Sequence, residues 1–307
     1  MNKPLLAALC SLAIAGLGAT PAAAAPAAHP TPERTPTTSL VGALTSITDD
    51  LARTAKETRA AWAAAGSFAG TVALSNCSGS LVRLPDSADS DPALVLSNGH
   101  CLQSGFPAPG EVVTGQSSSR TFGLLDASGS TVATLRADQL VYATMTDTDV
   151  SLYRLTSTYA QIKNAYGIDA LTLNDTHPVA GTDIQVVSGY WKRIYSCRID
   201  GFVHQLKEGD WTWKDSIRYT SACDTIGGTS GSPVIDTATG KVIAVNNTGN
   251  ENGGRCTVNN PCEIDENGNV TVRRGINYAE QTYQIPACFT TGNRLDLDAA
   301  GCTLPKP

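Results

Sequence analysis

The sequence has no excess of basic residues. Its 307 residues include 22 lysines and arginines against 28 aspartates and glutamates, which gives a formal net charge of −6. A protein that binds nucleic acid or an anionic membrane needs a basic face. Hydrophobic residues make up 41% of the chain, enough for a globular core. We therefore expect a globular protein whose partners are not nucleic acids.

Long apolar runs are also missing, apart from one near the N-terminus. Leu5 to Ala19 follows the charged Lys3 and precedes small residues at 23–25, the pattern of a secretory signal peptide over residues 1–25. The run is too short to anchor the chain in a membrane. Leu9, directly before Cys10, is too large for a lipoprotein signal. We expect a secreted protein with no membrane contact once the signal is removed.

Histidine is scarce and no CxxC pair occurs, so the sequence gives little support for a zinc site. Only one of the four histidines, His100, lies beside a cysteine. Loss of the signal peptide with Cys10 leaves an even number of cysteines, which in a secreted chain indicates disulfides. We expect no metal and no cofactor. The eight cysteines that remain are Cys77, Cys101, Cys197, Cys223, Cys256, Cys262, Cys288 and Cys302.

The composition changes twice along the chain. Residues 26–65 begin Pro- and Thr-rich and continue with helical spacing over 39–65, which predicts a prosegment or an N-terminal extension with one helix. From residue 66, short apolar runs alternate with Gly, Ser, Asp and Pro, which predicts an all-β fold, a barrel or a sandwich. The expected divisions are 66–156, 157–285 and a tail without clear regular structure over 286–307, with the crossing between the halves near 156–167.

Two smaller patterns have a structural and a functional interpretation. Asn267-Gly268 predicts a tight hairpin turn, and the neighbouring Asp265 would otherwise suggest calcium, but the spaced glutamate of a calcium loop is missing. The tryptophans at 191, 211 and 213 are interpreted as surface and packing residues rather than as a ligand platform.

The stretch CDTIGGTSGSPVID, from Cys223 to Asp236, presents Ser230 within a glycine-rich turn. Glycines let the backbone approach a substrate closely. The backbone N–H groups of Gly228 and Ser230 are candidates for binding a developing oxyanion. Most Gly/Ser loops are ordinary turns, so the assignment depends on partners elsewhere in the chain.

Two further stretches supply those partners. LVLSNGHCL ends an apolar strand on His100, which would be held firmly if Cys101 bonded to Cys77. TDTDVSLYRL places Asp149 where a loop enters a buried strand, and a carboxylate there can orient a histidine ring. Asp147 is the competitor, two residues earlier and expected to be more exposed.

Together these motifs resemble the trypsin/chymotrypsin family of serine endopeptidases over roughly residues 66–283. The order His100, Asp149, Ser230 is the family's, whereas an α/β-hydrolase would place the serine first. Two features depart from the mammalian members: Thr229 replaces the aspartate before the serine, and no Ile-Val-Gly-Gly start is present. SGSP in place of the family's SGGP, with the non-acidic Thr229 before the serine, resembles bacterial secreted enzymes near the glutamyl endopeptidase branch. The segments that carry the resemblance are CSGSLV, SNGHC, DVSLYRL and GGTSGSP.

The resemblance implies two antiparallel six-stranded β-barrels with the active site in the cleft between them. It implies a monomeric peptidase in which Ser230 is the nucleophile, His100 the base and Asp149 the orienting acid, acting on proteins or peptides. A catalytically silent member that binds a partner, and a disulfide-rich binding domain, are the alternatives. The disulfide Cys77–Cys101 follows from the resemblance. The pairs Cys197–Cys223, Cys256–Cys262 and Cys288–Cys302 complete the expected set.

Specificity is the least determined property. The resemblance assigns the pocket to Asp224, Thr225 and Asn246, where Asn246 stands in place of the histidine of glutamyl enzymes. A carboxylate at Asp224 would favour a cationic side chain, and Asn246 cannot become a cation. We therefore expect a polar or basic residue before the scissile bond. The alternative is that Asp224 turns away and the pocket takes small or uncharged residues.

Overall fold

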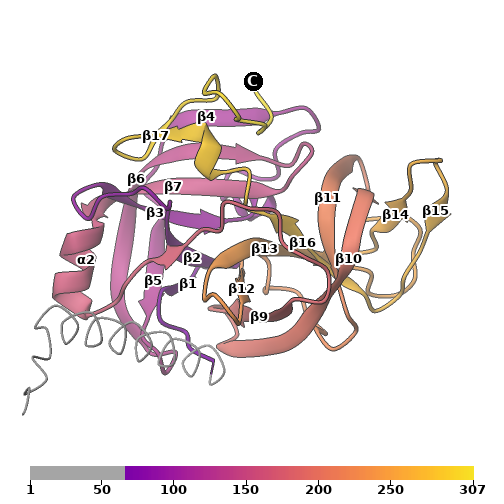
Figure 1. The fold of residues 1–307 in the computed structure, drawn as a ribbon, viewed down its shortest axis with the longest axis horizontal. Coiled ribbons are helices and arrows are strands. Elements are labelled where there is room, and N and C mark those ends of the chain that lie inside the picture. Colours follow the sequence, from indigo (N-terminus) through magenta and orange to yellow (C-terminus); the bar gives the residue numbers. More distant parts are fainter. Residues whose placement is uncertain (1–65) are drawn as a thin grey trace, which may run out of the picture. The chain divides into compact units, whose positions relative to one another are not determined.

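Strands dominate residues 66–307, which are the part of the chain that the computed structural model describes (Figure 1). The expected signal peptide (1–25) and the helix-bearing segment 26–65 lie outside the described residues. Within the described part, no helix is long and apolar enough to cross a membrane.

The first sheet closes into a six-stranded antiparallel barrel. The pairing runs β1-β5-β6-β7-β3-β2 and returns to β1, while β4 adds to β6 and β8 adds in parallel to β2. Its strands are β1 (Thr71–Ala73), β2 (Ser78–Arg83), β3 (Pro92–Ser97), β4 (Val112–Ser117), β5 (Thr121–Leu125), β6 (Thr131–Thr144), β7 (Val150–Thr158) and β8 (Leu171–Thr172).

The apolar runs of β2 and β3 are continuous because both of their faces are buried. Successive side chains of a strand point to opposite faces. Leu81 and Val95 therefore lie in the core of the barrel, whereas Val82 and Leu94 lie in a second cluster with Val245 of the other sheet. The two sheets thus share a hydrophobic interface built from the outer faces of these strands.

The second sheet forms a ring. Its pairing runs β11-β16-β13-β12-β9-β10, and β10 pairs again with β11, while β14 and β15 extend from β10. Its strands are β9 (Asp183–Ser188), β10 (Arg193–Glu208), β11 (Trp211–Tyr219), β12 (Pro233–Asp236), β13 (Val242–Gly249), β14 (Cys262–Ile264), β15 (Val270–Thr271) and β16 (Asn277–Gln281). The prediction of an all-β fold is confirmed, as one barrel and one ring-like sheet, each with additional strands.

The crossing between the two sheets contains a helix that the sequence did not predict. Helix α2 (Tyr159–Tyr166) begins with a capping box, in which Thr158 and Gln161 exchange side-chain to backbone hydrogen bonds. It ends at Gly167, whose φ of 68° is the left-handed conformation that favours glycine at a helix C-terminus. Tyr159 and Ile162 are buried.

The C-terminal tail is more ordered than expected. It contains a 3-10 turn, η2 (Pro286–Cys288), and a small hairpin of β17 (Phe289–Thr290) and β18 (Arg294–Leu295). Leu304 joins the cluster shared by the two sheets, and the hydroxyl of Tyr142 in β6 donates to the carbonyl of Pro305 at 3.0 Å. In Figure 1 this tail lies beside β4, so residues 286–307 pack against the first sheet.

The described residues contain four disulfides, and they join the expected pairs. Asn267-Gly268 forms the predicted hairpin turn between β14 and β15, where the Asp265 N–H donates to the Asn269 carbonyl at 3.0 Å. The disulfides are Cys77–Cys101, Cys197–Cys223, Cys256–Cys262 and Cys288–Cys302.

Candidate active site

His100 lies on a short 3-10 turn, η1 (Gly99–Cys101), directly after β3. Its Nδ1 lies 2.7 Å from Oδ2 of Asp149, and its backbone N–H donates to Oδ1 of the same carboxylate at 3.1 Å. Asp149 is fully buried just before β7. Asp147 is instead at the surface, where it pairs with Lys214 at 2.8 Å. The structure therefore brings Asp149, and not Asp147, against the imidazole.

The turn that carries His100 is held from several sides. Gly99 packs so closely on the carbonyl oxygen of Thr144 that a Cβ there would collide with it. The disulfide to Cys77 ties the next residue, Cys101, to β2. The carbonyl of Cys101 accepts hydrogen bonds from the buried guanidinium of Arg120, at 2.6 Å, and from Asn76, at 3.1 Å. The position of the turn is thus fixed jointly by close backbone packing, a disulfide and two side chains.

The environment of the imidazole raises its pKa. Desolvation lowers the pKa of His100, but the charge of Asp149, its hydrogen bond and a contribution from Glu208 together outweigh that effect. A histidine with a raised pKa holds an accepted proton more firmly, which suits a general base. Its side chain is only 18% exposed, so water reaches it from one side.

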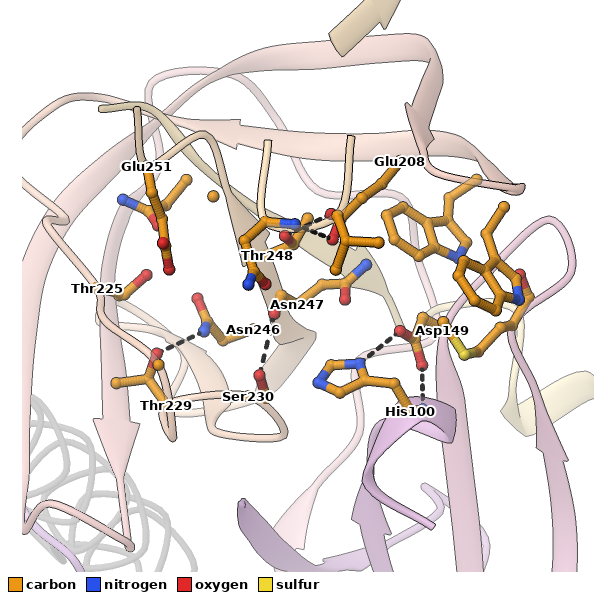
Figure 2. Close-up of a pocket in the computed structure, with 18 of the residues that line it drawn as sticks. His100, Asp149, Glu208, Thr225, Thr229, Ser230, Asn246, Asn247, Thr248 and Glu251 are labelled. Carbon is orange, nitrogen blue, oxygen red and sulfur yellow. Dashed lines mark hydrogen bonds and ion pairs between the residues drawn. The ribbon is translucent and has the colours of Figure 1, made fainter. Parts of the chain in front are cut away.

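Ser230 follows Gly228 and Thr229 in a turn that packs on β2. The Ser78 N–H donates to the Ser230 carbonyl at 2.8 Å, and Gly231 lies so close to the Ser78 carbonyl oxygen that no side chain fits. The Ser230 hydroxyl donates to the carbonyl of Asn247 at 3.2 Å. Figure 2 shows the His100 ring between Asp149 and Ser230, with its second nitrogen facing the serine.

The hydroxyl of Ser230 has therefore not paired with the imidazole. No hydrogen bond joins Ser230 and His100 within residues 66–307. Contacts of this kind are often long before substrate binds and tighten only in the complex.

The backbone beside the serine leaves two donors free. Within residues 66–307, no acceptor is bound to the N–H of Gly228 or to that of Ser230. Gly228 has a φ of 87°, and a Cβ there would lie 2.9 Å from Nε1 of Trp191. Trp191 in turn donates to the Gly227 carbonyl at 2.7 Å, so that oxygen already has a partner. Trp191, expected at the surface, therefore braces this turn.

A cavity opens beside His100 and Ser230, and polar neutral groups form one of its walls. Thr225 and Asn246 line it. The Asn246 amide is fixed at both ends, since it donates to the Thr229 hydroxyl at 3.1 Å and accepts from the Tyr219 hydroxyl at 3.2 Å. Asp224 does not line the cavity. It is exposed, because burial alternates along the extended segment 223–226 and Cys223 points into the core. The placement of the Asp224 carboxylate in the pocket was therefore wrong, and the alternative, that it turns away, agrees with the structure.

Several lining residues escaped the sequence analysis. Trp211 and Trp213 both line the cavity, although packing alone was expected of them, and Glu208 is buried in its wall. Asn247 presents the carbonyl that holds the Ser230 hydroxyl, and its amide donates to the buried carboxylate of Glu280 at 3.0 Å. None of these residues belongs to a short motif, so no local signal marked them.

The nearest potential metal ligands are not available to a metal. Cys77, His100 and Cys101 lie close enough to share an ion, but the two sulfurs are joined in a disulfide. The sulfur atoms of a disulfide are not thiolates and do not ligate zinc.

The chain matches a known protein family. A family model described as the trypsin-like peptidase domain matches residues 77–245, more than half of the chain. The Rv3671c protease from M. tuberculosis in its active form is 15% identical with a TM-score of 0.46, covering 80% of this chain and 86% of that chain. The HtrA-type protease AlgW with a tripeptide is 16% identical with a TM-score of 0.43, covering 73% and 60%. The MamO protease domain from Magnetospirillum magneticum is 13% identical with a TM-score of 0.41, covering 70% and 93%. A search of curated proteins found no match.

Proposed function

Because the chain belongs to the family of trypsin-like peptidases, we propose that it is a secreted serine endopeptidase that works through an acyl-enzyme. The observation that carries the proposal is the Asp149–His100 pair at 2.7 Å, with the free imidazole nitrogen facing Ser230 in one cavity. Four disulfides indicate an oxidising compartment outside the cytoplasm. Cleavage of a signal near residue 25 and a monomeric state complete the proposal.

In the proposed reaction, Oγ of Ser230 attacks the carbonyl carbon of the substrate while Nε2 of His100 takes the hydroxyl proton. The Asp149 carboxylate accepts a hydrogen bond from the Nδ1–H of His100 and stabilises the imidazolium without taking its proton. The N–H groups of Gly228 and Ser230 bind the oxyanion. His100 then gives its proton to the leaving amine, and the C–N bond breaks. Water, deprotonated by His100, hydrolyses the ester and restores the serine hydroxyl.

For the residue before the scissile bond, we propose a polar or basic side chain. Among residues 66–307, no lysine or arginine lines the cavity, whereas the carboxylates of Glu208 and Glu251 do. A glutamate side chain would therefore enter the cavity without a cationic partner, which costs desolvation and repulsion. We therefore propose that the protein resembles the glutamyl branch as a bacterial secreted enzyme, and that it does not share the preference of that branch for glutamate. Matched peptides with Arg, Gln, Ala and Glu at that position test this, and a strong preference for Glu would refute it.

The activity itself is tested with a fluorophosphonate, which labels only activated serine hydroxyls. Wild-type protein should be labelled at Ser230, and Ser230→Ala and His100→Ala should each lose peptidase activity by about 10⁴- to 10⁶-fold, because the three residues act as a unit. Ser232→Ala, two residues further on and buried, is the control for disturbance of the turn. A wild-type protein that is folded but not labelled would identify a silent family member instead.

A further inference from the structure

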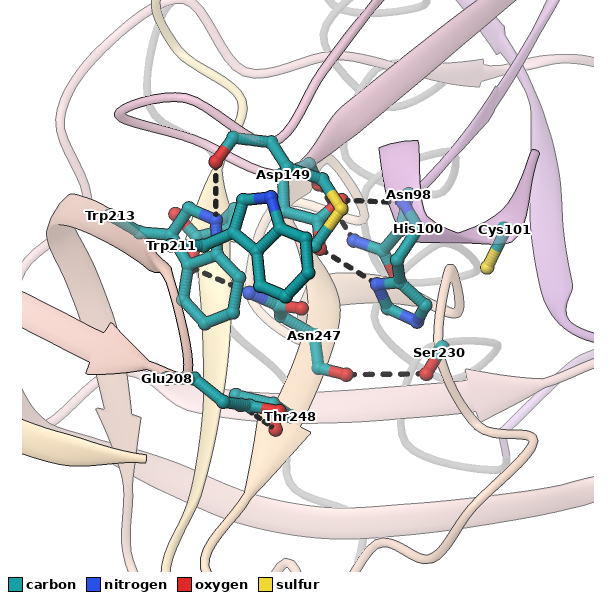
Figure 3. A network of polar contacts seen from close by, with 12 residues as sticks. Asn98, His100, Cys101, Asp149, Glu208, Trp211, Trp213, Ser230, Asn247 and Thr248 are labelled. Atoms are coloured by element: carbon teal, nitrogen blue, oxygen red, sulfur yellow. Dashed lines mark hydrogen bonds and ion pairs between the residues drawn. The ribbon is translucent and has the colours of Figure 1, made fainter. Parts of the chain in front are cut away.

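Glu208 is a buried carboxylate within the cavity that contains His100 and Ser230. It lies at the end of β10, directly before the turn into β11, and it is only 7% exposed. Figure 3 shows Glu208 beside Thr248 and on the same side of the site as Trp211. Glu208 takes no part in the proposed chemistry, so its burial in the cavity wall calls for another explanation.

Two neutral donors hold this carboxylate, and no cation does. The Thr248 hydroxyl donates to Oε2 at 2.6 Å, and the Asn259 N–H donates to Oε1 at 2.8 Å. Asn259 belongs to the loop closed by Cys256–Cys262, so the disulfide fixes its position. Within residues 66–307, no lysine or arginine forms an ion pair with Glu208. Burial raises its pKa, although the two hydrogen bonds and His100 oppose that change.

A carboxylate buried without a cationic partner costs free energy that a cation arriving in the cavity would recover. The neighbouring surface fits a long cationic side chain. Phe106 is 54% exposed, its ring lies 5.7 Å from that of Trp211, and both line the cavity. Aromatic rings suit the apolar stem of lysine or arginine, and they also attract its charged end.

This site is distinct from the pocket wall formed by Thr225 and Asn246. Side chains of an extended peptide alternate between opposite sides. A residue next to the one that enters that pocket therefore points toward the other side of the cavity. Phe106 lies between this site and the base, because its ring is 5.7 Å from that of Trp211 and 5.8 Å from that of His100.

We propose that Glu208, with Thr248, Phe106 and Trp211, binds a lysine or arginine side chain of the substrate on the acyl side of the scissile bond, next to the residue that enters the pocket. The inference rests on the proposed peptidase function. It assigns the enzyme a second cation-selective position and names its substrates as peptides with a basic residue there.

The test uses peptide amides of a fluorogenic amine, which differ only at this position and carry Arg, Lys, Ala or Glu. Wild-type enzyme should show a kcat/KM about 10- to 100-fold higher for Arg than for Ala, the range of a charge-assisted hydrogen bond. In Glu208→Gln this ratio should fall to near one, and Glu208→Lys should favour Glu. Glu266→Gln, which changes an exposed carboxylate outside the cavity, should keep the wild-type ratio.

Fluorophosphonate titration of each variant separates the two proposals. If the wild-type protein is not labelled, the peptidase function fails first. If the wild type and Glu208→Gln are both labelled but show the same Arg-to-Ala ratio, the peptidase function stands and the role of Glu208 is refuted. If Glu208→Gln is not labelled, Glu208→Ala, which also removes the carboxylate, replaces it, and an unchanged ratio there also counts against the inference.

Discussion

The two sheets present their parts of the site in opposite ways. On the first, the imidazole of His100 is held by a fully buried carboxylate, a disulfide and a backbone turn. On the second, Ser230 lies in a glycine turn, and its hydroxyl is bound to a carbonyl of its own sheet instead of to the base. The imidazole is therefore already held in place, whereas the serine hydroxyl is paired with a backbone carbonyl and not with the imidazole. Substitutions in each half test whether the two halves of the site contribute differently.

The largest effect is expected from the half that carries His100. Asp149→Asn should lower kcat by about 10⁴-fold, because an amide in that place favours the wrong tautomer of the histidine. Asp147→Asn, two residues away in an exposed ion pair, should leave kcat within a few-fold of wild type. Steady-state kinetics of both variants measure the contrast. Equal losses would mean that the whole turn, and not the buried carboxylate, supports the base.

Glu280, a buried carboxylate of the second sheet, provides the corresponding prediction for the half that carries Ser230. Glu280 accepts hydrogen bonds from Ser216 and from Asn247, and burial raises its pKa to about 8, although these bonds oppose the change. The folded state then keeps a proton that the unfolded chain releases near its ordinary pKa. Stability should fall as pH rises from about 4.5 to about 8, by on the order of a few kcal/mol, and level off above that.

Glu280→Gln should lack this loss. Urea unfolding of wild type and Glu280→Gln across pH 5–9 measures it, as the difference in the free energy of unfolding between the two proteins. Parallel profiles would show that Glu280 does not titrate in this window.

Two disulfides sharpen the comparison between the halves. Removing Cys77–Cys101, which spans 24 residues, should cost about 3 kcal/mol of unfolding free energy, and removing Cys256–Cys262, which spans 6, about 2 kcal/mol. The first double alanine variant should also lower kcat/KM for every substrate, since it loosens the turn of His100. The second should change the selectivity set by Glu208. Urea unfolding measures the losses of stability, and the fluorogenic peptides measure kcat/KM and selectivity. If the two double variants changed kcat/KM and selectivity in the same way, the proposed division of roles between the two halves would be wrong.

The smallest effect is expected in the nucleophile turn. Gly228→Ala forces a side chain into left-handed backbone next to Trp191 and should lower kcat/KM by about 10- to 100-fold, the equivalent of about 1–3 kcal/mol. Gly227→Ala adds a Cβ with no atom within 4 Å and should have little effect. An unchanged Gly228→Ala enzyme would show that the turn relaxes freely.

The sequence predicted those parts of the site that local patterns carry. His100, Asp149 and Ser230 each lie within a motif of a few residues, and Asn267-Gly268 specifies its own turn. Glu208 has no such motif, because its contact with Thr248 joins residues 40 positions apart through the folding of β10 over β13. Helix α2 escaped detection because its two buried residues give only a weak period. Asp224 was wrongly placed in the pocket because only its position before Ser230 was considered. Burial alternates along residues 223–226, and since Cys223 is buried, Asp224 is exposed.

The tail has a consequence for how the enzyme is made. Ile285, Cys288 and Leu304 complete the hydrophobic cluster between the two sheets, yet they are synthesised after every strand of both. Contacts so distant in sequence form slowly, since a long loop must close before they contribute. A nascent chain that has emerged only as far as β16 therefore lacks part of the interface that aligns His100 with Ser230. The packing of the two sheets against each other is therefore completed only when the tail is present.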